Sequence, residues 1–96
     1  MVLLVVIVIV MNKKQNKILE DIFVKPTKSN IKWIDIEKLM ISLGSKIREG
    51  KGSAGVFIIN NKIFPFHRPH PQKEAKRYQI DDLRKFLKNI GVSYEK

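Results

Sequence analysis

The 96-residue chain contains no cysteine, and this absence excludes two classes of protein. A disulfide-stabilised domain needs paired cysteines, and a thiolate metal site needs them as ligands. The absence also fits a reducing compartment, so we expect a cytoplasmic protein. The chain is too short for two domains of ordinary size, and its hydrophobic content of 44% argues against wholesale disorder. We therefore expect one domain with a single modest core.

Acidic residues are few: nine Asp and Glu stand against nineteen Lys and Arg, which leaves a net charge of +10. An excess of this size opposes compaction through self-repulsion and favours an anionic partner. The candidates are a nucleic acid, an acidic membrane surface and an acidic protein.

A long hydrophobic run is also missing. The apolar stretch MVLLVVIVIVM covers only residues 1–11, whereas a membrane-spanning helix needs about 20 residues. A secretory signal would place basic residues before the apolar stretch, but Lys13 and Lys14 follow it. Three interpretations stay open: a non-native upstream extension, a buried or partner-pairing β-strand, and a degenerate membrane anchor. We expect no stable membrane association.

Three segments have the apolar spacing of amphipathic helices. The first runs from Lys13 to Phe23 and ends before the loop that contains Pro26. The second is followed by Gly44 and the third by Gly91, and we expect each glycine to form a left-handed cap. The apolar positions of these two helices are Ile36, Leu39, Met40 and Leu43, and Ile80, Leu83, Leu87 and Ile90. We expect residues 12–30 to form a leader helix and loop, and residues 31–96 to form the main domain.

Between the second and third helices the period changes to that of strands, which we expect at residues 45–49, 56–59 and 62–66. A glycine turn at residues 50–52 and an asparagine pair at residues 60–61 separate them. Pro65 places the third strand at an edge or cuts it short. The predicted fold is α+β: a three-stranded antiparallel sheet with helices packed on one face and the other face open.

Basic side chains are frequent in this strand-and-turn region, and an open sheet bordered by them suits a phosphate backbone. The glycine turn could also let backbone amides approach an RNA phosphate. The alternative is that these residues only keep an ordinary surface soluble. The candidate RNA-binding residues are Lys46, Arg48, Lys51, Ser53, Lys62 and Arg68.

The two histidines, His67 and His70, are the natural acid–base candidates for RNA cleavage, with Arg68 between them to hold the scissile phosphate. The alternative is that both bond loop backbone and that the neighbouring prolines stiffen the loop. A zinc site would need distant carboxylates in addition, so we predict no metal and no cofactor. The glycine stretch joins two strands and lacks the spacing of a nucleotide-binding loop, which excludes that class.

The order and spacing of several motifs resemble those of the HicA toxins. The motifs are a short helix ending at Gly44, a Gly-Lys-Gly-Ser turn at residues 50–53, a β-hairpin, His70-Pro71 and a closing pattern of Leu83, Leu87 and Gly91. The resemblance covers about residues 31–92. Residues 11–30 are similar to the leader of one branch of that family, which would place the native start at Met11.

The resemblance implies a double-stranded-RNA-binding-like α-β-β-β-α fold, here with an extra N-terminal helix. It also implies the toxin component of a type II toxin–antitoxin system: an mRNA interferase that inhibits translation and is neutralised by a HicB-like antitoxin. In the best-known members the Gly-Ser pair precedes a catalytic histidine, but Ala54 stands there in this chain. Therefore either His67 or His70 substitutes, or the branch binds RNA without cutting it, or this copy is defective. The alternative function is a non-catalytic module that binds nucleic acid or docks an antitoxin.

Overall fold

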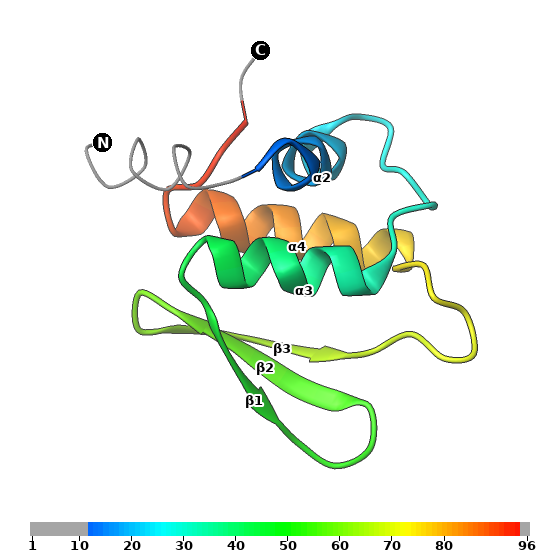
Figure 1. Ribbon diagram of the computed structural model, residues 1–96, viewed down its shortest axis with the longest axis vertical. Helices are drawn as coiled ribbons and strands as arrows, with labels where there is room; N and C mark the ends of the chain where they lie inside the picture. The colour runs from blue at the N-terminus through cyan, green and yellow to red at the C-terminus, as the bar shows by residue number, and fades with distance from the viewer. Residues whose placement is uncertain (1–11, 95–96) are drawn as a thin grey trace.

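The structure, a computed structural model, describes residues 12–94 (Figure 1). The interpretations of the apolar stretch at residues 1–11 lie outside the described residues. In chain order the elements are α2 (Lys13–Phe23), α3 (Trp33–Ser42), β1 (Lys46–Glu49), β2 (Ala54–Ile59), β3 (Lys62–His67) and α4 (Arg77–Asn89).

Helix α2 has the bounds that the sequence predicts, because both its start and its buried face are encoded locally. The Asn12 side chain accepts a hydrogen bond from the Gln15 backbone N–H at 2.8 Å, and the Gln15 side chain accepts one from the Asn12 backbone N–H. This reciprocal arrangement satisfies donors that a helix start leaves free. The apolar stripe of Ile18, Leu19 and Ile22 is buried in the common core.

Helices α3 and α4 end where the sequence predicts but begin earlier than their apolar periodicity suggests. Gly44 and Gly91, which follow them, have φ values of +100° and +88°, a region that favours glycine. At its start, α3 includes Trp33, whose backbone N–H donates to the Lys73 carbonyl at 2.9 Å. A pairing across 40 residues of chain therefore determines where α3 begins.

The strands form an antiparallel sheet in the order β1-β2-β3. Asn60 and Asn61, with φ values of 51° and 62°, form the tight turn between β2 and β3, as their sequence predicts. Pro65 lies in β3, which is an edge strand. Strand β2 begins at Ala54, two residues before its predicted start, and β1 begins at Lys46.

Helices α3 and α4 lie on one face of the sheet, and α2 packs against these two helices on the side away from the sheet (Figure 1). Burial alternates along β2, and Gly55, Phe57 and Ile59 face the helices. Phe57 packs against Phe66 with ring centroids 4.5 Å apart, and Trp33 lies 5.2 Å from the Phe66 ring. The predicted α+β class, with its three-stranded antiparallel sheet and its leader helix, is confirmed.

Candidate functional site

The candidate site lies on the open face, which we define as the face of the sheet opposite the helices. Its residues alternate with the buried ones and pair across the strands, because directly paired residues share a face. The cross-strand rows are Lys46, Ile58 and Ile63; Arg48, Val56 and Pro65; and Ala54 with His67. No helix or loop within residues 12–94 covers this face (Figure 1).

The rows show that the charge on the open face is uneven. The cations Lys46 and Arg48 both belong to β1, the centre is aliphatic, and His67 stands at the end of β3. Ile63 is 55% exposed at the edge. The open face is therefore apolar in the middle and basic along one side, and differs from the continuous basic border that composition suggests.

A hollow of about 280 Å³, here called the sheet depression, lies where this face meets the glycine turn. Its lining includes Arg48, Glu49, Val56 and His67, so that a guanidinium group and an imidazole come from strands on opposite sides of β2, and the Glu49 carboxylate borders the same hollow. Ala54, which pairs directly with His67, also lines it. An imidazole and a fixed cation beside one hollow can move a proton and hold an anion there.

His70 lies away from this hollow. It lines a different and mostly apolar groove of about 400 Å³ between the start of α3 and the loop after β3, together with Ile34, Pro69 and Pro71. The two histidines therefore line separate depressions, and nothing in their arrangement supports the predicted paired acid–base action. Of the two, His67 is the one placed beside the cations of the open face.

Arg68 does not have the role that its position between the histidines suggests. Its Nε donates to Glu37 at 2.7 Å, and its Nη1 and Nη2 donate to the two oxygens of Glu49 at 2.8 Å and 2.9 Å. The guanidinium also lies 5.4 Å from the centre of the Phe66 ring. Two carboxylates already occupy this donor group, so Arg68 ties α3, β1 and β3 together and is not free to hold a phosphate.

The pKa values of this cluster follow from the same contacts. Hydrogen bonding to Glu49, and then to Glu37, raises the pKa of Arg68. Hydrogen bonding from Arg68 holds the pKa of Glu49 below its usual range. Both Arg68 and Glu49 are therefore charged at neutral pH.

The remaining predicted phosphate contacts divide into two groups. Lys51 and Ser53 are exposed in the turn between β1 and β2. The Ser53 carbonyl accepts a hydrogen bond from the backbone N–H of Arg68 at 2.8 Å. These two residues lie near the sheet depression. Lys62 pairs with Ile59, which faces the helices, and therefore does not belong to the open face.

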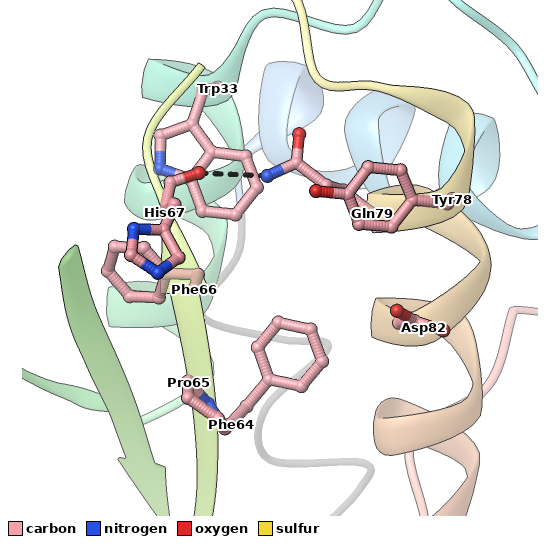
Figure 2. Close-up of a pocket in the computed structure, with 8 residues that line it drawn as sticks. All are labelled: Trp33, Phe64, Pro65, Phe66, His67, Tyr78, Gln79 and Asp82. Carbon is pink, nitrogen blue, oxygen red and sulfur yellow. Dashed lines mark hydrogen bonds between the residues drawn. The ribbon is translucent and has the colours of Figure 1, made fainter. Parts of the chain in front are cut away.

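A second hollow beside His67 has no counterpart in the predictions from sequence. This β3–α4 pocket, of about 130 Å³, is lined by Trp33, Phe64, Pro65, Phe66 and His67 on one side and by Tyr78, Gln79 and Asp82 of α4 on the other (Figure 2). No local signal could have indicated it, because its two walls are more than ten residues apart in sequence and each has an ordinary strand or helix pattern.

Gln79 holds the two walls of the β3–α4 pocket together. Its Nε2 donates to the His67 carbonyl at 2.8 Å (Figure 2), and its Oε1 accepts from the Lys76 N–H at 2.9 Å. Since one side chain satisfies both the end of β3 and the start of α4, the backbone of His67 has a defined position.

The fold and the site define a small basic α+β protein with an uncovered three-stranded sheet. No protein-family model, curated protein or solved structure matches the chain. Within residues 12–94, no three His, Asp or Glu side chains are grouped so as to hold a metal ion. The helices of this same segment are all too short or too polar to cross a membrane.

Proposed function

We propose that the protein is the toxin component of a type II toxin–antitoxin system, with a double-stranded-RNA-binding-like fold that binds mRNA over its open face. The observation that carries the proposal is the sheet depression, where His67 and Arg48 lie beside one hollow on an uncovered sheet. The motifs that resemble those of HicA toxins indicate the same class of protein, a toxin that acts on mRNA.

The open face and its turn carry cations that have no ion-pair partner within the described residues, and this supports an anionic ligand there. Some cations elsewhere form ion pairs, as Lys17 does with Asp21 at 3.2 Å and Arg84 with Asp81 at 3.1 Å, whereas others, such as Lys38 and Lys88, form none within the described residues. Lys46, Arg48 and Lys51 likewise form no ion pair with any residue in the described part of the chain. Unpaired cations at one side of the sheet are available to phosphates and require no internal ion pair to break.

In this proposal His67 has the catalytic role, because of its position in the register between β2 and β3. Directly paired residues of an antiparallel sheet have Cβ atoms about 5 Å apart, so the His67 imidazole stands next to the position from which a histidine at residue 54 would project. His67 would remove the proton of the ribose 2′-hydroxyl as that oxygen bonds to the adjacent phosphorus. The P–O5′ bond would break, the 5′-oxygen would take a proton from water, and Arg48 would stabilise the charge that develops on the phosphate.

The test is RNA cleavage by the purified protein. We expect wild-type protein to cut an mRNA fragment and His67→Ala to lose about a hundredfold or more in rate. His70→Ala is the matched control, since it removes the same group from a loop outside the sheet depression, and we expect it to retain full activity. Equal cleavage by wild type and both variants would refute the role of His67.

A second candidate function is a non-catalytic module that docks an acidic HicB-like antitoxin. The apolar centre of the open face favours it, because Val56, Ile58, Ile63 and Pro65 offer an aliphatic surface beside two cations. This candidate predicts a stable complex with such a partner and no RNA cleavage. The same face can serve both functions, since an acidic partner would cover the cations that RNA needs.

A further inference from the structure

The β3–α4 pocket has the size and walls of a site for a single aromatic ring. Its volume is about 130 Å³, and an apolar cavity of roughly 150 Å³ admits one benzene ring. A purine, with two fused rings, is larger. Phe64 and Tyr78 provide aromatic side chains from the two opposite walls (Figure 2), and Tyr78 is 60% exposed. Aromatic side chains in such positions stack on nucleobases.

Asp82 is the charged polar group of this pocket (Figure 2). Its carboxylate forms no hydrogen bond or ion pair with any other residue between 12 and 94, although the chain is strongly basic. Its neighbour Asp81 is occupied, since it contacts Thr27 and Arg84. The amide of Gln79 is likewise occupied by backbone groups. Asp82 therefore provides a carboxylate at this pocket whose oxygens are free to accept hydrogen bonds. An ionised carboxylate accepts hydrogen bonds and cannot donate them.

The β3–α4 pocket lies next to the proposed RNA site, on the other side of β3. Pro65, Phe66 and His67 line both the pocket and the sheet depression, so the last residues of β3 form the wall between them. A strand whose phosphate lies beside Arg48 and His67 needs to cross only this edge strand to bring an adjacent base to the pocket.

We propose that the β3–α4 pocket binds a pyrimidine base of the RNA and prefers cytosine to uracil. The N4 amino group of cytosine donates a hydrogen bond to a carboxylate, whereas uracil presents the O4 acceptor at the same position. Asp82 therefore attracts cytosine and repels uracil. This inference rests on the proposed function, because it requires an RNA strand on the open face.

The test measures binding of fluorescein-labelled r(C)8 and r(U)8 by fluorescence anisotropy. We expect wild-type protein to bind r(C)8 about tenfold more tightly than r(U)8. In Asp82→Asn the ratio should fall close to one, because an amide can both accept from N4 and donate to O4. Tyr78→Ala should weaken binding of both oligonucleotides, since it removes a stacking wall.

Glu74→Gln is the matched control: it removes one negative charge, as Asp82→Asn does, from a residue that lines a different hollow. We expect it to leave the tenfold ratio unchanged. Equal binding of the two oligonucleotides by wild-type protein, or an unchanged ratio in Asp82→Asn, would overturn the pocket inference and leave RNA binding standing. If neither oligonucleotide binds at low salt, both the inference and the proposed function fail.

Discussion

Arg48 and Arg68 show how differently two residues of one type behave within 20 positions of each other. Arg48 projects from the open face without an ionic partner, whereas Arg68 is held by Glu37 and Glu49 on the other side of the sheet. Position decides the outcome, because Arg48 lies in a cross-strand row of the open face with Val56 and Pro65, whereas Arg68 follows β3 and reaches Glu37 of α3. Arg48 is therefore available to a ligand, and Arg68 stabilises the fold.

The Arg68 cluster predicts a specific pH dependence of stability. Hydrogen bonding from Arg68 lowers the pKa of Glu49 below its ordinary value of 4.5 in the folded protein. The stabilisation is therefore present above pH 4.5 and is lost as the pH falls through the lowered value. Glu49→Gln cannot titrate, so we expect wild type to have the higher Tm at pH 6 and the difference to narrow at pH 3. A Tm difference that is the same at both pH values would contradict this.

Gly55 is a second residue whose identity matters, because of a close approach by Phe66. A Cβ atom at position 55 would lie 2.7 Å from Cζ of Phe66, and Phe66 is buried between Trp33 and Phe57. We expect Gly55→Ala to lower the free energy of unfolding by about 1–3 kcal/mol in chemical denaturation. Lys51→Ala, at an exposed position nearby, should change it by less than about 0.5 kcal/mol. Equal stability of the two variants would refute the steric argument.

The sequence predicts that α2 belongs to a leader segment before the main domain. In the structure, α2 packs into the same hydrophobic core as the other helices. Ile18, Leu19 and Ile22 are buried in the cluster that contains α3 and α4. Arg84 of α4, which is 7% exposed, donates to the Ile22 carbonyl at 2.8 Å and to Thr27 Oγ1 at 2.9 Å. One buried guanidinium therefore holds both the end of α2 and the loop that follows it.

This contact predicts that α2 loosens when Arg84 is replaced by a residue of similar length without donors. We expect Arg84→Met to cost about 2 kcal/mol in free energy of unfolding, because it leaves the buried Ile22 carbonyl without its donor. Hydrogen exchange of the α2 amides should accelerate more than that of the α3 amides. Lys85→Met, at the exposed neighbouring position, is the control and should leave the exchange of α2 as in wild type.

The starts of the helices show which boundaries can be predicted from neighbouring residues and which cannot. The start of α2 is predictable because Asn12 and Gln15 form a capping box within its own sequence. Helix α3 begins after Lys32, which makes no side-chain cap, and its start depends on pairing of Lys32 with Glu74. A boundary of that kind cannot be derived from a window of neighbouring residues.

At the scale of the whole molecule, the structure shows where some of the cations behind the net charge of +10 lie. The helix layer carries most of the ion pairs that the described residues form, and three of the cations that form none, Lys46, Arg48 and Lys51, lie at the β1 side of the sheet. These three cations make the β1 side of the sheet a place where an anionic strand can bind. The charge excess by itself indicates such a partner but not where it binds.

This distribution predicts which lysines contribute to the salt dependence of RNA binding. We expect Lys46→Ala to reduce the slope of log Kobs against log salt concentration by about 0.7 for a single-stranded RNA, because one phosphate contact is lost. Lys17→Ala is the control, since Lys17 belongs to α2 and pairs with Asp21. Slopes measured from 50 to 300 mM salt check this, and an equal reduction in both variants would mean that binding is spread over the surface.

The sequence alone determined the class of the fold, since helical and strand periodicities, the Asn60-Asn61 turn and the terminating Gly44 and Gly91 each depend on residues a few positions apart. Only the tertiary structure decided which charges are free and which cavities exist. Arg68 meets carboxylates 19 and 31 positions away, and the β3–α4 pocket has walls from two distant segments. Such neighbours come together through the folding of the sheet against the helices, and a local pattern carries no information about them.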